Sequence, residues 1–181
     1  MIEVLRISDM RVVRTPSGRE GRVLAFDLRD LLPLVADEAQ GLRWAAIPLG
    51  NEDTDILGDE SPLGEKAFAL GAKVDASEEG VPLEWNDLVE LTGSIRQTAW
   101  GTFVGVRDSA AFAEIPRLFN GDWRYVDRGT ARFYEIVEIA FQAVDSAFWQ
   151  VWVKDTALRE RIRSAFSSVE TIPGESRYEP S

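Results

Sequence analysis

Hydrophobic and polar positions in the first 28 residues follow a pattern that is typical of β-strands, and a further strand-like run lies at 42–49. Strands are expected at 2–7, 10–14, 21–28 and 42–49. The turn formers of "TPSGREG" separate the second run from the third. A short helix is expected over 30–41, since Asp30 can cap its N-terminus and Gly41 can end it.

Helical spacing of apolar residues takes over after residue 60. Ser61 followed by Pro62 predicts a helix start, and Gly71 predicts its end. Further elements are expected as a helix over 86–97 capped by Asn86, a strand over 99–108, a short helix before Pro116 and an amphipathic helix over 155–169. The stripe of the last helix consists of Leu158, Ile162, Ala165, Phe166 and Val169.

The aromatic stretch at 133–155 fits two periods at once. Its first part alternates as a strand but also carries a helical stripe, while its end, "FWQVWV", alternates cleanly. β-branched and aromatic residues favour strands, so we expect a long hairpin in which 132–144 pairs with 147–153. A helix over 131–144 is the alternative. Most of these aromatic residues should be core, with Trp152, Trp123 and Tyr125 as the exposed exceptions that bind a partner.

These elements predict an α+β fold, a mainly antiparallel sheet with flanking helices and a C-terminal β-hairpin followed by an amphipathic helix. With 45% hydrophobic residues and six Trp, the 181-residue chain can bury a sizeable core. We expect one domain over 1–169 and a loose tail over 170–181. A division into a β-rich part at 1–50, an acidic connecting segment at 51–81 and an α+β part at 82–169 is the alternative.

The negative charge is concentrated in the middle of the chain. Residues 51–90 hold twelve acids and two lysines, a net charge of −10 out of −11 for the whole chain. Such a block attracts basic partners and repels nucleic acid. The acids expected to bind a partner are Glu52, Asp53, Asp55, Asp59, Glu60, Glu78 and Glu79.

The composition excludes several chemistries. The chain has neither cysteine nor histidine, so disulfides, thiolate sites, His-ligated metals and Ser-His-Asp triads cannot form. "NEDTDILGDES" offers oxygen ligands for calcium or magnesium, but its spacing fails the EF-hand pattern and favours a solvated loop. Glu135 and Glu138 would point to opposite faces of a strand. We therefore expect no metal, cofactor or catalytic residue.

A basic and aromatic patch contains Arg124, Arg128 and Arg132 beside Trp123 and Tyr125. That combination is typical of single-stranded nucleic-acid sites, but the acidity of the chain favours salt bridges to the acidic segment instead. No apolar run reaches the roughly 18 residues of a membrane span, and the first residues lack the pattern of a signal peptide. The expectation is a soluble cytoplasmic protein.

Three hypotheses of function follow from these features. The charge block, the missing histidine and cysteine and the aromatic surplus favour a non-enzymatic protein-binding module. It would be an acidic inhibitor or immunity-type protein that binds a basic partner, such as a nuclease or a DNA-binding protein. The alternatives are an Asp- or Glu-based enzyme or small-ligand binder, with or without magnesium, and a self-associating structural subunit.

Overall fold

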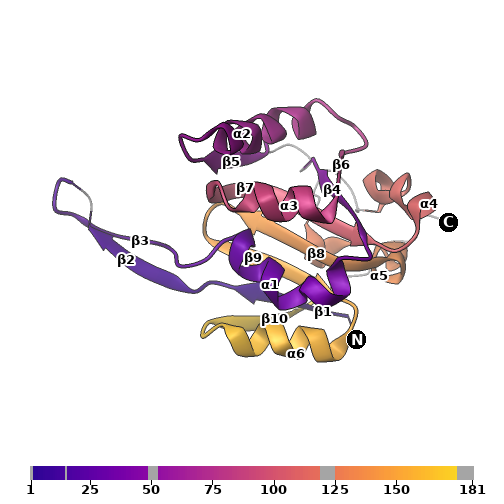
Figure 1. The fold of residues 1–181 in the computed structure, drawn as a ribbon. Helices are drawn as coiled ribbons and strands as arrows, with labels where there is room; N and C mark the ends of the chain where they lie inside the picture. The colour runs from indigo at the N-terminus through magenta and orange to yellow at the C-terminus, as the bar shows by residue number, and fades with distance from the viewer. Residues whose placement is uncertain (1, 15, 49–52, 119–124, 175–181) are drawn as a thin grey trace.

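The computed structural model describes residues 2–14, 16–48, 53–118 and 125–174, and it confirms an α+β fold with a mostly antiparallel sheet (Figure 1). Eight strands form the main sheet in the order β10-β1-β9-β8-β7-β4-β6, with β5 paired to β7. The main strands are β1 (Glu3–Ile7), β4 (Arg43–Ile47), β5 (Asp55–Gly58), β6 (Val81–Leu83), β7 (Ile95–Val106), β8 (Val137–Val144), β9 (Phe148–Val153) and β10 (Val169–Pro173). Two further strands, β2 (Met10–Arg14) and β3 (Glu20–Leu24), pair only with each other.

Helices cover both faces of the main sheet. They are α1 (Leu28–Ala39), α2 (Pro62–Asp75), α3 (Trp85–Thr92), α4 (Ser109–Phe112), α5 (Ala131–Ile136) and α6 (Thr156–Ala165), with 3₁₀ turns η1 (Ile115–Arg117) and η2 (Val126–Arg128). The apolar residues of α1, α2, α3 and α6 join one core cluster with one face of the sheet. Residues of α4, α5, η1 and η2 close a second cluster on the other face. None of the described helices is both long and apolar enough to cross a membrane.

The aromatic stretch forms a helix followed by a hairpin. Residues 131–136 are the helix α5, capped by Thr130, and only from Val137 does the chain extend as β8 and pair with β9. The predicted strand over 132–144 is therefore correct from Val137 onward, and the alternative helix over 131–144 is correct up to Ile136. The hairpin turns at Asp145 and Ser146, whose positive φ angles suit a tight turn between twisted strands. As expected, Trp149, Val151 and Val153 lie in the core that α6 covers.

Several helix ends differ from the predictions. Helix α1 begins after Asp27 instead of Asp30, and Asp30 occupies the third helical position of a capping box. Helix α2 starts at Ser61 as predicted but continues past Gly71 to Asp75. Helix α3 follows Glu84 instead of Asn86 and ends at Thr92, so that Ile95 belongs to β7.

The first residues of the tail that was expected to be loose form a strand. Residues 170–173 belong to β10, which pairs along the whole of β1 in antiparallel register. Ile172 is buried in the second core cluster, and Gly174 N donates to Ile2 O. The edge of β1 offers unpaired backbone N–H and C=O groups to this segment, and this pairing cannot be predicted from the local sequence.

The pair β2–β3 projects from the body as an arm, which we define as residues 10–14 and 16–24 (Figure 1). Its base is fixed to the body, because Ala25 N donates to Asp9 O and the Asp9 carboxylate accepts from Ser167 N. The rings of Phe26 and Phe166 lie 4.6 Å apart beside this base. The direction of the arm is therefore set by the folded body.

Candidate functional site

The acidic segment folds into one region, the acidic lobe, which comprises residues 53–92 with β5, α2, β6 and α3 (Figure 1). The strand β7 is long enough to serve two parts of the sheet. Its second half pairs with β4 and β8, while its first half, 95–100, carries β5. Helix α2 then packs directly on β5, where a Cβ at Gly71 would lie 2.7 Å from Thr54 O.

The acids of the lobe are exposed and mostly unpaired. Of the eleven acids that the structure describes between 53 and 90, ten are exposed, and Asp59 is half-buried. Glu60 lies 3.9 Å from Arg96, the one ion pair formed by these acids within the described residues. Arginines elsewhere lie closer to carboxylates, as Arg161 does to Glu38 at 3.0 Å. The lobe therefore keeps a negative field that internal ion pairs do not cancel.

The predicted partner-binding acids lie toward the two ends of α2 instead of forming one cluster. Asp59 and Glu60 precede its N-terminus, while Glu78 and Glu79 follow its C-terminus, about 20 Å away along a helix of this length. Asp53 lies near the second end, because its neighbour Thr54 donates from its backbone N to Asp75 at 2.8 Å.

Two other members of that set are placed differently. Asp55 is exposed on β5, and Glu52 lies outside the described residues. Hydrogen bonds from the Ser61 hydroxyl and backbone N lower the pKa of Asp59, so this carboxylate is occupied in ending β5 and starting α2.

A mostly apolar groove lies between α1 and α3. It has a volume of about 310 Å³, and its lining residues are Arg29, Leu32, Pro33, Ala36, Trp85, Val89, Thr92 and Gly93. Val89 is 44% exposed. The Trp85 ring packs at a tilt against the buried Trp44, with ring centroids 5.8 Å apart, and this contact supports one wall of the groove.

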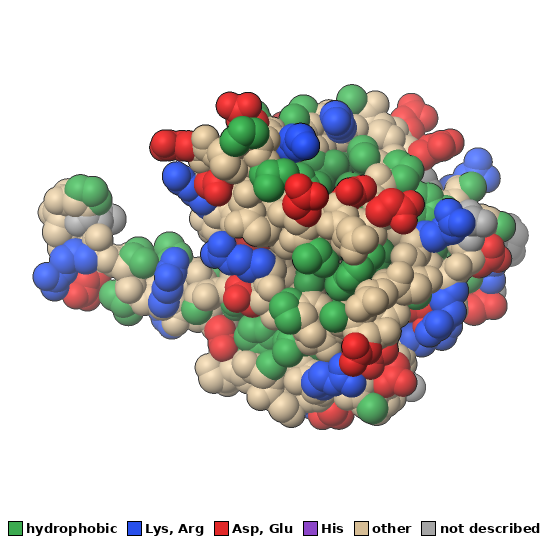
Figure 2. Space-filling model, in the orientation of Figure 1, with side chains coloured by type: hydrophobic (Ala, Val, Ile, Leu, Met, Phe, Trp, Pro, Cys, Tyr) green, Lys and Arg blue, Asp and Glu red, His purple; other side chains and the backbone are tan. Residues whose placement is uncertain are grey.

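A second groove lies on the other side of α3, between α3 and α2. Its volume is about 360 Å³, and Lys66 and Lys73 of α2 line it opposite Asp87 and Glu90 of α3. Figure 2 shows acidic side chains gathered over α3, with apolar side chains in the hollows on either side. The two grooves therefore share one wall.

Three acids lie along the exposed side of α3, and we call them the α3 ridge: Glu84 just before the helix, and Asp87 and Glu90 within it. All three are exposed, and none forms an ion pair with any described residue. These acids belong to the negative block of the sequence but were not among the predicted partner-binding acids. Their spacing of three, interleaved with Trp85 and Leu88, was the available signal, since such spacing places side chains along one side of a helix.

Trp152, one of the aromatic residues predicted at the partner surface, is buried instead. Trp152 is only 6% exposed and donates from Nε1 to Val137 O at 3.1 Å, which corrects the expectation of an exposed side chain. Its ring packs edge-on against Tyr134. Tyr125 is half-buried next to η2, and Trp123 lies outside the described residues. Side chains on both faces of β9 are therefore buried in the two core clusters.

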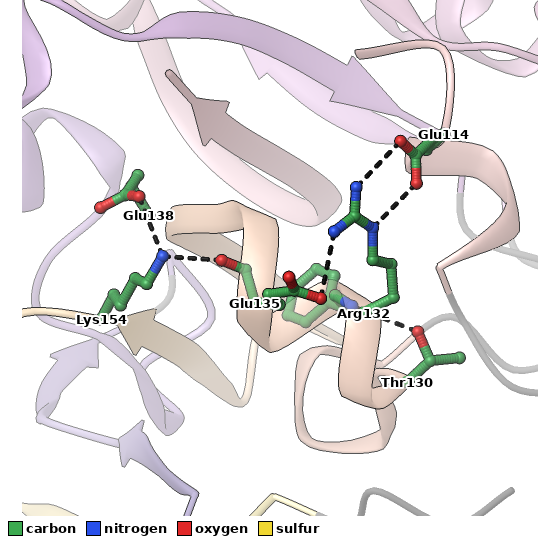
Figure 3. Close-up of polar contacts among 7 residues, drawn as sticks. Glu114, Thr130, Arg132, Glu135, Glu138 and Lys154 are labelled. Carbon is green, nitrogen blue, oxygen red and sulfur yellow. Dashed lines mark hydrogen bonds and ion pairs between the residues drawn. The ribbon is translucent and has the colours of Figure 1, made fainter. Parts of the chain in front are cut away.

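Arg132, which was expected to pair with the acidic segment, forms ion pairs with two glutamates near α5 instead (Figure 3). Arg132 binds Glu114 through two hydrogen bonds of 3.0 and 3.2 Å and lies 3.0 Å from Glu135. These contacts raise the pKa of Arg132 and lower the pKa of Glu114. Arg132 therefore pairs beside α5 and not with the acidic segment.

Glu138 points away from this pair. Lys154 Nζ lies 3.1 Å from Glu138 Oε1 and also donates to Glu135 O (Figure 3). The carboxylates of Glu135 and Glu138 are thus held by different cations and do not converge as an acid–base pair. Arg128 is exposed at η2, and Arg124 lies outside the described residues.

The buried polar groups hold structural elements together. Gln142 Oε1 accepts from Val126 N at 2.9 Å, and Gln150 Oε1 accepts from Asp127 N at 3.2 Å, which fixes η2 on the sheet. Asp27 is buried where α1 meets β7, and burial raises the pKa of its carboxyl. In the part of the chain that is described, no three side chains of metal-binding type gather.

Comparisons with protein-family descriptions, curated protein sequences and solved structures found no match for this chain.

Proposed function

We propose that this protein is a non-enzymatic binding module whose α1–α3 groove takes a basic, amphipathic helix of a protein partner. One observation carries the proposal: an apolar groove lies directly beside the unpaired α3 ridge. Helix-in-groove recognition needs an apolar floor for one face of the bound helix and charge at the rim for its polar face.

The floor of the groove supports this occupant. Val89 and Pro33 are exposed, and the half-buried Trp85 is held in place by Trp44. A rigid tryptophan within an apolar site is typical of the residues that dominate binding energy at interfaces. Burying these side chains would stabilise a complex through the hydrophobic effect.

The rim supports a basic partner. The α3 ridge carries three negative charges along the helix that forms one wall of the groove, and Asp37 is exposed on α1, one helical turn from Pro33. Arg29, the charged residue that lines the groove itself, lies 3.9 Å from Asp30. Lys or Arg side chains at the edges of a bound helix would meet these carboxylates, whereas an acidic helix would be repelled. An acidic inhibitor or immunity-type protein, directed at a basic protein such as a nuclease or a DNA-binding protein, is the class that fits this surface.

A synthetic peptide tests the proposal directly. The probe is a helical Lys/Leu peptide with leucines at i, i+3, i+4 and i+7, and fluorescence anisotropy measures its binding across a range of salt concentrations. We expect binding that weakens as salt rises, because rim charges are screened. The substitutions Glu84→Gln, Asp87→Asn and Glu90→Gln together should weaken binding at least about tenfold, a loss of roughly 1.4 kcal/mol.

A matched variant separates the groove from the general charge of the lobe. Glu65→Gln, Glu78→Gln and Glu79→Gln remove the same charge from the lobe at residues that line neither groove, and should weaken binding much less. Val89→Ser should also weaken binding without any change in charge. Equal effects of the two triple variants, or equal binding of a Glu/Leu peptide, would refute the proposal.

A further inference from the structure

Most of the surface of the arm is not covered by any other part of the described chain. Beyond its base, neither β2 nor β3 makes extensive contact with another described element. Val12 is 66% exposed, the largest exposed fraction among the large hydrophobic residues of the described chain. An isolated two-stranded hairpin is marginally stable in water, so packing against a further surface would stabilise this one.

The arm is basic in an acidic protein. It contains four arginines and one glutamate, a net charge of +3 in a chain of net charge −11. Arg11 and Arg22 are exposed. Arg22 lies directly across from Val12 in the strand pairing and shares its face of the arm, while Arg11 lies on the other face. Basic and apolar side chains therefore alternate along the arm (Figure 2).

A surface of opposite character lies where β5 leads into α2. We call it the β5–α2 end and define it as Leu57, Glu60, Glu65 and Phe68. Leu57 is 42% exposed and Phe68 is 64% exposed. Glu65 and Phe68 are three residues apart on α2 and are therefore surface neighbours. This end lies on the same side of the molecule as the arm (Figure 1).

We infer that two copies of this chain associate by placing the arm of each against the β5–α2 end of the other. Arg22 then meets Glu60 and Glu65, while Val12, on the same face of the arm, packs against exposed apolar side chains of the β5–α2 end. Because arm and acceptor lie on one side of each copy, a two-fold axis allows both contacts at once and closes the assembly as a dimer.

The charge of the molecule favours a second copy of the chain over nucleic acid as the partner that binds the arm. A duplex bound to the arm would bring its phosphates toward the acidic residues on the same side of the molecule, and like charges repel. The inference uses residues outside the α1–α3 groove. It therefore holds or fails independently of the proposed function.

Sedimentation velocity of the purified full chain at low and high salt tests the inference. We expect a dimer at low salt that dissociates as salt rises. The variant Arg11→Glu/Arg22→Glu and the variant Glu60→Lys/Glu65→Lys should each weaken the dimer at least about tenfold, since like charges would then face each other. Arg43→Glu/Arg117→Glu makes the same charge change as the arm variant at exposed residues outside the arm, and should leave the dimer intact.

Mixing the two dissociated variants is the decisive step. In a mixed dimer one contact is wild type and the other has both charges reversed, so opposite charges face each other at both. We expect the mixture to form a dimer although neither variant does so alone. This result cannot arise from variants that merely fail to fold.

Several results would overturn the inference. They are a wild-type chain that stays monomeric at low salt, a dimer that survives the arm variant, and a mixture that stays monomeric. Binding of a double-stranded DNA oligonucleotide by a monomeric wild-type chain, lost in Arg11→Glu/Arg22→Glu, would assign the arm to nucleic acid instead. In all these cases the Lys/Leu peptide assay of the α1–α3 groove remains a separate measurement.

Discussion

At the scale of single residues, Asp27 shows how one buried side chain joins distant parts of the chain. Its Oδ1 accepts from Leu28 N at 2.7 Å and from the Thr98 hydroxyl at 2.9 Å, and its Oδ2 accepts from Thr98 N at 2.8 Å. The carboxylate thus caps α1 and ties it to β7, 71 residues away. Asp30 was selected from local pattern alone, because the partner Thr98 is invisible to a local reading.

Asp27→Asn should destabilise the protein by roughly 2–3 kcal/mol, because an amide group replaces one acceptor and leaves a buried donor unsatisfied. Urea unfolding measures the change in free energy. Thr98→Val is the matched control, since it removes only the hydroxyl donor and should cost about 1 kcal/mol. A cost for Asp27→Asn no greater than that of Thr98→Val would show that the three hydrogen bonds do not act together.

The same carboxyl gives a pH dependence of defined sign. Burial raises the pKa of Asp27 above its ordinary value of 3.8, so the folded state keeps this proton when the unfolded chain has lost it. As pH rises from 3.8 through the raised pKa, the contribution of Asp27 to stability falls. The free-energy difference between wild type and Asp27→Asn should therefore shrink over this window, and a difference that grows would contradict the raised pKa.

At the scale of elements, the packing of α2 on β5 explains a helix that the sequence reading ended too early. Glycine is the usual residue just after a helix, so Gly71 predicted a stop. In the structure Gly71 lies inside α2, where its lack of a side chain lets the helix approach Thr54 O. Close contact between elements, and not backbone conformation, accounts for this glycine.

Gly71→Ala should therefore destabilise the protein by about 1–3 kcal/mol through overpacking, although alanine favours helices by roughly 1 kcal/mol. Thermal and urea unfolding measure the change. Gly41→Ala, at a glycine with open space around it, should be neutral or slightly stabilising. If Gly71→Ala proved stabilising, helix propensity would outweigh the contact with β5.

At the scale of the whole molecule, the unpaired acids of the lobe should make folding sensitive to salt. Ten exposed acids in the described lobe repel one another, and the single ion pair with Arg96 relieves little of that repulsion. Added sodium chloride screens the repulsion. We expect the free energy of unfolding to rise with salt in wild type and to rise less in Glu65→Gln/Glu78→Gln/Glu79→Gln. A decrease with salt would mean that attractive pairs dominate.

The sequence by itself determined the features that depend on local period and composition. Alternation defined most strands, and the charge count defined the acidic lobe. The apolar stripe defined α6 as far as Ala165, but the helix predicted to reach 169 ends there, and Val169 begins β10. Each of these follows from residues that are neighbours in the chain, where side-chain spacing and backbone preference act directly. The exclusion of histidine and cysteine chemistry also needs no structure.

The tertiary structure decided which side chains are buried and which distant elements pack against each other. It buried Trp152, placed 170–173 on β1, and divided the aromatic stretch into α5 and a hairpin because two core clusters needed covering. It also set the α1–α3 groove beside the α3 ridge and left the arm projecting. Burial and juxtaposition depend on contacts between residues far apart in the chain, and no local pattern encodes them.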